Sequence, residues 1–418
     1  MKRYLYGIDF GTTNSALAIF DEETKEIHST IIIPSLIYFH QEPGAGYVVG
    51  EAAIEAYLSD NMQGRFIKSV KQILSRSSFT ETRIHNKRYN APDLVAIILK
   101  ELKQRADQFT GHNCRKAVIG RPVFFNDDDT QKDTLAQTRL SKAAELAGFT
   151  DVRFQFEPIG AAFAYEKTLT KKENVLVADL GGGTTDFTYL VLDPARAGSK
   201  DRQNDMMANG GIYVGGDSFD SAFMWEKGTP YFGKNTRYEA TPGKVLTVPV
   251  SLFANICSWE QMNFFNGLRI KKDIEDYYYF SGKDPLFKNL VTLIDNNLGY
   301  SVFQAIEKTK ITLTNADTAS FSYHQMGIAI DERIPLPDYE QIIAKDVARI
   351  AGYLDNFMLR NNIDPQHIDS LFLTGGTSMV SSIQALFKTR FPHVKLNSGD
   401  NFKSVAKGLA YSGYLFEN

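Results

Sequence analysis

The chain of 418 residues carries 46 Lys and Arg against 49 Asp and Glu, for a formal net charge of −3, and 43% of its residues are hydrophobic. This balance, without a lysine-rich tail, argues against bulk binding to nucleic acid, and no apolar stretch approaches the length of a membrane span. The length exceeds what one hydrophobic core holds, and it therefore predicts two domains or two large lobes.

The first half of the chain predicts strands that alternate with helices. Strand patterns cover residues 4–8, 16–20, 27–33, 116–123 and 152–156, and helical spacing covers 94–109 and 126–149. In the second of these helices, acidic residues occupy the first turn and Gly148 follows the end, as capping favours. The strand at 152–156 is expected to turn at Glu157 and Pro158 into a further helix.

The second half begins at about residue 171. Strands are predicted at 174–180 and 186–192, a surface loop at 195–211, a glycine turn running into a helix at 373–391, and a helix at 403–416. Residues 221–300 are rich in aromatic side chains and give no clear pattern. The two cysteines, Cys114 and Cys257, lack metal-ligand spacing. We therefore expect both cysteines to be reduced and structural. Asp9 ends the N-terminal apolar run too early for a signal peptide, so we also expect a cytoplasmic protein.

Two turns in the chain share one pattern. GIDFGTTNS (7–15) and VADLGGGTTDF (177–187) each follow an apolar run with Asp, Gly and Thr-Thr, and each leads into another apolar run. One such turn would be ordinary, because Asp, Gly and Thr are common turn residues. Two copies at matching places predict a duplicated α/β unit with two related lobes.

The composition of these turns suits a phosphate ligand. Glycine lets backbone N–H groups approach an anion closely, and threonine hydroxyls add donors. Carboxylates repel phosphate, so Asp9, Asp179 and Asp186 are expected to act through a divalent cation. Mg²⁺ fits this role because it keeps several waters and takes few protein ligands. A third glycine turn, LTGGTS at 373–378, fits the same nucleotide site.

Taken in order, these segments resemble the nucleotide-binding domain of the 70-kDa heat-shock chaperones of the DnaK type, in the actin/hexokinase ATPase superfamily. The matching segments are GIDFGTTNS, GRPVFFNDDDTQ (120–131), FEPIGAAFAYE (156–166), VADLGGGTTDFTYL (177–190), GIYVGGDSFD (211–220), AIEKTKITLT (305–314) and LFLTGGTSMVSSIQ (371–384). They span nearly the whole chain. The phosphate motifs alone also fit actin-like and sugar-kinase relatives.

The resemblance implies an α/β, actin-like ATPase fold with two duplicated lobes around a central nucleotide cleft. Lobe I would cover 1–170, an enlarged lobe II 171–398, and a C-terminal helix at 399–418 would return to lobe I. The implied ligands are ATP or ADP with Mg²⁺.

The resemblance also implies a role for each matching residue. Phosphates would be held by Gly11, Thr12, Thr13, Gly181, Gly182, Gly183 and Thr184, with Gly215 and Gly216 nearby. Hydrated magnesium would be held by Asp9, Asp179 and Asp186. The catalytic set would be Lys71, Glu157, Thr184 and Asp186, with Glu157 placing the metal shell or the attacking water. Lys68 is the rival of Lys71 for the γ-phosphate. The nucleoside would be held by Glu307, Lys310, Gly375, Gly376 and Met379. Without the resemblance, the i,i+3 spacing of Glu307 and Lys310 favours an exposed ion pair on one helix.

Three features depart from the family pattern. The chain is expected to lack the acidic-and-leucine linker and the peptide-binding β-domain, as in truncated YegD-like members. Ile311 and Met379 stand where the family has arginines that sandwich adenine, which puts base affinity in question. The segment 221–300 is longer than in the chaperones. It is either an enlarged lobe with its own core, which we favour, or a surface for a protein partner or a nucleotide-exchange factor.

We therefore predict a slow, magnesium-dependent ATPase that acts as a conformational switch in a chaperone-like role, without a peptide-binding domain. A catalytically weak nucleotide sensor or scaffold that binds a protein partner is the alternative. An actin-like filament former is disfavoured by the segment 305–314, and a small-molecule kinase by the lack of an obvious sugar-binding carboxylate set. Nucleic acid and membranes are not expected partners.

Overall fold

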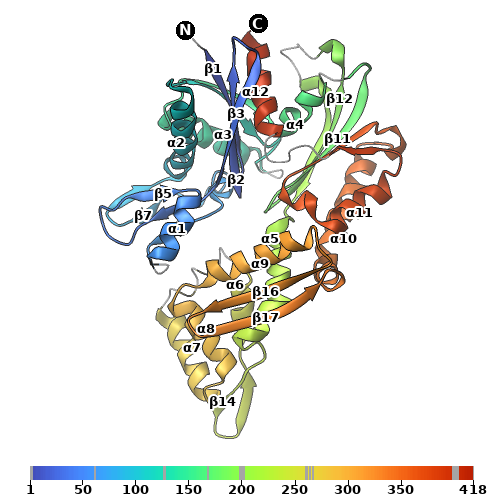
Figure 1. Cartoon of the computed structure of the whole chain (residues 1–418). Helices are drawn as coiled ribbons and strands as arrows, with labels where there is room; N and C mark the ends of the chain where they lie inside the picture. Colours follow the sequence, from blue (N-terminus) through green and yellow to red (C-terminus); the bar gives the residue numbers. More distant parts are fainter. Residues whose placement is uncertain are drawn as a thin grey trace. The chain divides into compact units, whose positions relative to one another are not determined.

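The computed structural model describes residues 3–60, 63–125, 129–166, 169–196, 203–258, 262, 265, 268–397 and 404–417. They form two compact units. The first comprises Met1–Tyr213, Ala351–Ser378 and Gln384–Asn418, and the second comprises Val214–Ile350 and Met379–Ile383. These units divide the chain elsewhere than at residue 170, so the lobe boundaries predicted from the sequence remain predictions. Figure 1 shows the elements of each unit.

The first sheet of the first unit is built around β1 (Tyr4–Phe10). β1 pairs antiparallel with β2 (Asn14–Asp21), which pairs antiparallel with β3 (Glu26–Pro34). On its other edge β1 runs parallel to β9 (Lys116–Arg121), which runs parallel to β10 (Asp151–Phe156). β1 and β2 are buried at almost every position, which explains their continuous apolar runs.

The second sheet repeats this arrangement. β11 (Glu173–Leu180) pairs antiparallel with β12 (Thr185–Leu192), and β12 pairs antiparallel with β13 (Met206–Ile212). β11 also runs parallel to β18 (Ser370–Thr374), and β18 runs parallel to β19 (Lys395–Asn397). Strand order and strand directions match those of the first sheet. The predicted duplication is therefore confirmed.

β13 corrects one prediction. Residues 195–211 were expected to form a surface loop, but β13 occupies the end of this segment. The sequence MMANGGI has no apolar alternation, so its extended shape comes from pairing with β12 and not from local preference. Its glycines allow close packing, because a Cβ on Gly211 would lie 2.1 Å from Asp186 Oδ1.

Helices cover both faces of the first sheet. α2 (Ala91–Thr110) and α3 (Thr130–Leu146) pack together on one face, while α4 (Glu157–Glu166) and α12 (Ser404–Glu417) pack together between the two sheets (Figure 1). α4 and α12 follow the equivalent strands β10 and β19, so their pairing continues the duplication. They cross at glycines, because a Cβ on Gly408 would lie 1.8 Å from Gly160 O.

Capping residues decide where these helices begin and end. α2 begins at Ala91, earlier than predicted, because Asn90 and Asp93 bind each other's backbone N–H groups. Asp129 caps α3, and Gly148 follows its end with a φ of +94° as predicted. Residues 126–128 of the predicted helix lie outside the described residues. No separate turn precedes α4, which begins at Glu157 because proline is tolerated in a first turn.

Smaller elements complete the N-terminal part of the first unit. They are β4 (Ile37–Phe39), β5 (Tyr47–Val49), α1 (Glu51–Ser59), β6 (Arg65–Ile67), β7 (Thr82–Ile84) and β8 (Lys87–Tyr89). A 3₁₀ turn at Val70–Ile73 follows β6. α11 (Ser381–Arg390) and the end of α10 (Leu336–Arg360) support the second sheet, where Phe187 contacts the rings of Tyr353, Phe357 and Phe387.

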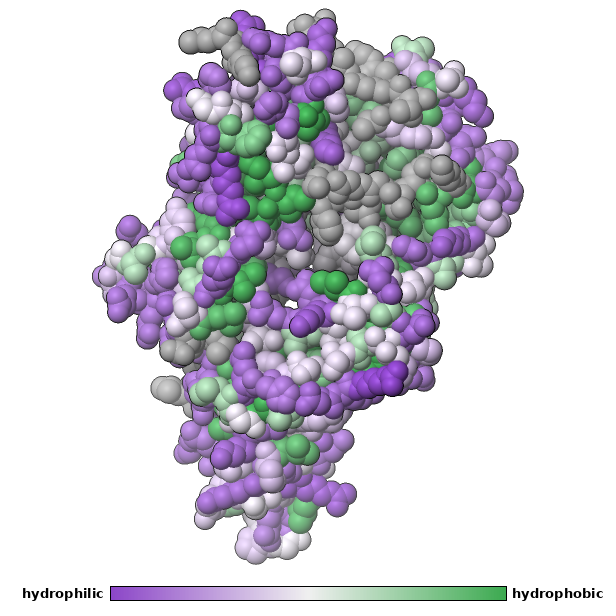
Figure 2. Space-filling view, in the orientation of Figure 1, coloured by the Kyte–Doolittle hydropathy of each residue, from purple (hydrophilic) through white to green (hydrophobic). Residues whose placement is uncertain are grey.

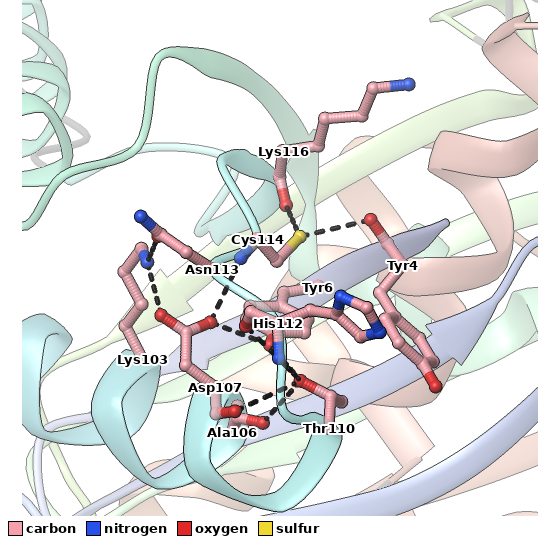
Figure 3. A network of polar contacts seen from close by, with 10 residues as sticks. All are labelled: Tyr4, Tyr6, Lys103, Ala106, Asp107, Thr110, His112, Asn113, Cys114 and Lys116. Atoms are coloured by element: carbon pink, nitrogen blue, oxygen red, sulfur yellow. Dashed lines mark hydrogen bonds and ion pairs between the residues drawn. The ribbon is translucent and has the colours of Figure 1, made fainter. Parts of the chain in front are cut away.

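A partly buried polar network anchors α2 to the start of β1 (Figure 3). Asp107 Oδ1 accepts hydrogen bonds from the Tyr6 hydroxyl at 2.9 Å and from the Cys114 backbone N–H at 3.1 Å, and Lys103 Nζ binds Asp107 and Asn113. Burial raises the pKa of the Cys114 thiol to about 11. Cys114 and Cys257 are both buried and free, which confirms the expectation of structural thiols.

The second unit is built mainly from helices around two hairpins. Its elements are α5 (Gly216–Phe223), a π turn at Met224–Gly228, a 3₁₀ turn at Thr229–Phe232, β14 (Arg237–Thr241), β15 (Lys244–Thr247), α6 (Val250–Ile256), α7 (Leu268–Phe280), α8 (Pro285–Asp295), α9 (Gly299–Leu313), β16 (Thr318–Gln325) and β17 (Ile328–Pro335). Exposed and buried side chains alternate along β16 and β17, and the outer face of this hairpin is mainly hydrophilic (Figure 2).

The aromatic-rich segment 221–300 has a core of its own. Phe223, Phe232, Phe253, Phe265 and Phe287 are fully buried, which supports the enlarged lobe over a mainly interactive surface. Trp259 lies outside the described residues, while Tyr279 and Phe280 at the end of α7 are exposed. None of the described helices combines the length and the apolar character that crossing a membrane requires.

Candidate functional site

The two Asp-Gly-Thr turns occupy equivalent positions in the two sheets. Asp9 is the last but one residue of β1 and Asp179 the last but one of β11, and a glycine directly follows each strand. Across the hairpins, Asp9 pairs with Ala16 whereas Asp179 pairs with Asp186. The second turn therefore carries two carboxylates where the first carries one.

The first turn has a fixed shape. A Cβ on Gly11 would lie 2.1 Å from Asn14 O, so the turn requires glycine there. Ser35 binds the turn twice: its backbone N–H donates to Thr13 O and its hydroxyl donates to Gly11 O, both at 2.8 Å. The buried hydroxyl of Ser15 contacts that of Ser35 at 2.7 Å. Sequence reasoning missed Ser35, because it lies beyond β3 and carries no local signal.

The second turn is closed on itself and tied to the third glycine turn. The Gly181 N–H donates to Thr184 O at 2.9 Å, and Thr184 Oγ1 donates to Asp186 Oδ2 at 3.0 Å. Gly182 and Gly183 lie between these residues. From the third turn, Thr377 Oγ1 donates to Gly181 O at 2.8 Å. Two glycine turns almost 200 residues apart thus meet in one place, as β11 and β18 are neighbours.

The third turn also holds a carboxylate in position. Thr374 Oγ1 donates to Asp179 Oδ1 at 2.9 Å. Gly375 has a φ of +79°, and a Cβ there would lie 2.2 Å from Leu180 O. This backbone conformation and this close approach both require glycine. Gly376 begins the following 3₁₀ turn at Gly376–Met379. The sequence pointed to these glycines, but it gave no sign of Thr374 or Thr377.

Lys71 and Glu157 form a largely buried ion pair. Lys71 Nζ lies 2.8 Å from Glu157 Oε1, and the side chains are 15% and 9% exposed. The two residues are 86 positions apart in the chain, and Glu157 begins α4. Lys71 therefore faces the predicted catalytic carboxylate.

The segment that carries Lys71 is held rigidly. Ser69, which directly precedes the 3₁₀ turn, has a φ of +60°, a strained value for a residue other than glycine. Arg139 of α3 donates to the carbonyls of Ile73, Leu74, Arg76 and Phe79 at 2.9 to 3.0 Å. These bonds fix the chain directly after Lys71 and offset the local strain.

The charges around this pair are unbalanced. Burial, together with Glu157 and Asp179, raises the pKa of Asp9 to about 8 against the opposing effect of Lys71. Burial also raises the pKa of Glu157. Burial lowers the pKa of Lys71, but Glu157 and Asp9 outweigh it and hold that pKa above its usual value. One ammonium thus faces several carboxylates, and a further cation would lower the cost of ionising Asp9.

The carboxylates suit a cation that is bound through water. Within the described ranges, no three His, Cys, Asp or Glu side chains are grouped so as to hold a metal ion directly. Magnesium commonly keeps several waters and uses only one or two protein carboxylates. Asp179 and Asp186, which pair across the second hairpin, supply carboxylates that fit a hydrated magnesium ion.

The remaining predicted residues lie in the second unit. Lys310 of α9 lies 2.7 Å from Asp220 Oδ1 of α5, while Glu307 is exposed. The expectation of an exposed ion pair between Glu307 and Lys310 is thus wrong, because a buried carboxylate on a neighbouring helix binds the lysine instead. Burial lowers the pKa of Lys310, but Asp220, which sequence reasoning missed as a partner, acts with Glu307 and Asp217 to hold that pKa above its usual value.

Gly216 begins α5 in the same unit, and Gly215 directly precedes the helix. Ile311 is 59% exposed and Met379 is 41% exposed, so both present apolar surface. How these residues approach a nucleotide remains a prediction.

Comparison with known proteins agrees with this geometry. The family model described as Hsp70 protein matches residues 5–237 of the chain. The chain belongs to the Hsp70 family. Its two equivalent sheets are those of the family's actin-like ATPase fold, which confirms the predicted fold class.

The similar curated proteins carry the name chaperone protein DnaK. The protein from Thermosipho melanesiensis is 34% identical over 230 residues, which cover 53% of this chain and 35% of that protein. The protein from Thermotoga neapolitana is 27% identical over 426 residues, covering 98% of this chain and 59% of that protein. The protein from Mesomycoplasma hyopneumoniae is 25% identical over 423 residues, which cover 99% of this chain and 58% of that protein. The chain thus spans between a third and three fifths of these relatives' length.

Proposed function

We propose that this Hsp70-family chain binds ATP with magnesium and hydrolyses it slowly, as a conformational switch in a chaperone-like role. The single observation that carries the proposal is the buried Lys71–Glu157 ion pair, which lies within electrostatic reach of Asp9 and Asp179 at the ends of equivalent strands. A lysine is rarely buried unless it is paired, and phosphoryl transfer needs fixed charges of both signs around one group.

In the proposed mechanism, the phosphate-binding turns hold the nucleotide in one geometry. The turns that follow β1 and β11 present backbone N–H groups, and Ser35 and Thr377 keep the turns in shape. When bound, magnesium would neutralise charge on the phosphates. Asp9, Asp179 and Asp186 would hold its waters. Most of the rate enhancement then comes from positioning and electrostatics.

The chemical step needs no covalent intermediate. The oxygen of a water molecule, oriented by Glu157, forms a bond to the γ-phosphorus while the bond to the bridging oxygen breaks. The bridging oxygen keeps the electron pair and leaves with ADP, and one proton of the water is released with the phosphate. Lys71 would stabilise negative charge on the transferred group. The Glu157 carboxylate accepts a hydrogen bond from Lys71, and the ammonium thereby opposes the rise of its pKa.

The switch and partner roles rest on relatedness and on the second unit. The relatives are named as chaperones, and nucleotide-driven rearrangement is a common basis of switching. We propose that the exposed end of α7, with Tyr279 and Phe280, takes part in binding a protein partner or an exchange factor. We further propose a cytoplasmic location, which the two free, buried thiols favour.

Single-turnover hydrolysis of γ-labelled ATP with excess protein tests the proposal. We expect slow release of phosphate that requires magnesium and is abolished in Asp186→Asn. The matched control is Asp151→Asn, an exposed aspartate at the start of β10 in the same unit. Release that is equal in the wild type and in Asp186→Asn would refute the ATPase role.

A nucleotide sensor is the second candidate. The exposed Ile311 and Met379 favour it, because they stand where the family resemblance expects stacking arginines. In this case ATP and ADP raise the melting temperature by mass action, while no phosphate is released above the Asp186→Asn control. The same two measurements therefore separate the two candidates.

A further inference from the structure

The residue next to Lys71 lies against the second phosphate-binding turn. Gln72 occupies the same 3₁₀ turn, Val70–Ile73. An ideal Cβ on Gly183 would lie 3.0 Å from Gln72 Nε2, closer than such contacts usually are. Gly183 thus gives the amide room to approach. The nearest atom to that Cβ belongs to a side chain, whereas a Cβ on Gly11 or on Gly375 would first meet a backbone oxygen.

Neighbouring side chains of one short turn thereby contact two different elements of the site. Lys71 binds Glu157 at the start of α4, whereas Gln72 lies at Gly183. The backbone between them is held, because the Gln72 N–H donates to Ser69 O at 3.1 Å and Arg139 binds the carbonyl of Ile73. The amide is therefore carried by a preorganised segment, as recognition of a reacting group requires.

The side-chain amide of Gln72 has donors and an acceptor available for a ligand. In the part of the chain that the structure describes, its side chain makes no hydrogen bond to another residue, although it is half-buried. A glutamine amide carries two donors and one acceptor. It can donate to a phosphoryl oxygen and accept from a water molecule at the same time, without adding charge to a site already rich in carboxylates.

We propose that Gln72 contacts the γ-phosphoryl group of ATP and makes the site discriminate a nucleoside triphosphate from a diphosphate. This inference rests on the proposed function, because it needs the second turn to hold phosphate. A hydrogen bond to a charged group contributes more than a neutral one, and the γ-phosphoryl group is absent from ADP. Removal of the amide therefore weakens binding of the triphosphate selectively.

The test compares Gln72→Leu with wild type by calorimetric titration of β,γ-imido-ATP and of ADP, both with magnesium. Gln104→Ala, an exposed glutamine of α2, is the control. We expect the affinity for the triphosphate analogue to fall about tenfold, with a change of less than threefold for ADP. Single-turnover hydrolysis in Gln72→Leu should fall at least tenfold. Gln72→Glu should lose more affinity for the analogue, because it keeps the shape but places a carboxylate near phosphate.

The outcomes are distinct. An unchanged ratio of the two affinities in both Gln72 variants, while the wild type hydrolyses ATP, overturns the inference and leaves the proposed function standing. If that unchanged ratio comes with an equal loss of affinity for both nucleotides, Gln72 only shapes the turn. If the wild type binds neither nucleotide, the proposed function fails and this inference fails with it.

Discussion

Replacement of Lys71 by methionine should destabilise the protein in a way that depends on pH. The substitution keeps the aliphatic stem but removes the ammonium, which leaves Glu157, 9% exposed, without its ion-pair partner. Breaking a buried pair costs about 3 kcal/mol when the remaining carboxylate stays charged. At about 2 °C per kcal/mol for a large domain, the melting temperature should fall by about 6 °C at pH 8.

The direction of the pH effect follows from the raised pKa of Glu157. An acid whose pKa is higher in the folded state than in the unfolded state favours folding while it is protonated, and this contribution is lost as the pH rises through the folded value. Without Lys71 the folded pKa rises further, because the opposing charge is gone. The deficit of Lys71→Met should therefore be small near pH 5 and should grow toward pH 8.

Thermal melting without nucleotide measures this effect. Lys71→Met, Glu157→Gln and the double variant form a double-mutant cycle at pH 5 and at pH 8. We expect Glu157→Gln to recover much of the stability lost in Lys71→Met at pH 8, since a neutral amide costs less to bury. A melting temperature of Lys71→Met equal to wild type at pH 8, or a deficit that is the same at both pH values, contradicts the reasoning.

Three further predictions concern close contacts and the shape of the turns. Gly408→Val should lower the melting temperature by several degrees or prevent folding, because a Cβ at this position would lie 1.8 Å from Gly160 O. The control is Gly352→Ala in α10, where a Cβ meets nothing within 4 Å, and it should be neutral or stabilising in the same assay. Gly375→Ala should weaken ATP binding at least tenfold and lower stability by about 1 to 3 kcal/mol, since the turn needs φ of +79°; an unchanged titration would show that the backbone relaxes. Ser35→Ala removes the hydrogen bond from the hydroxyl to Gly11 O and should raise the Kd for ATP about fivefold, while circular dichroism shows that the fold is retained. Unchanged binding would mean that the backbone hydrogen bond to Thr13 O is sufficient.

Local patterns were sufficient for much of the fold. The strands β1, β2, β11 and β12, the helices α2 and α3, and the duplicated Asp-Gly-Thr turns all follow from apolar periodicity, capping and turn composition. These signals lie within 10 to 20 residues of sequence, where side-chain spacing and backbone conformation are directly linked. β13 was missed because its extended shape comes from a neighbouring strand and not from its own residues.

The residues of the site could likewise be inferred from the sequence, but the contacts between them could not. Glycines and aspartates identify the turns. Glycine permits the tight backbone geometry, and aspartate can hold the waters of a magnesium ion. Only the tertiary structure joined Lys71 to Glu157, Thr374 to Asp179, and Lys310 to Asp220. Each of these contacts links segments 86 to 195 positions apart. Residues at such separations are brought together by sheet pairing and helix packing, which no local spacing encodes.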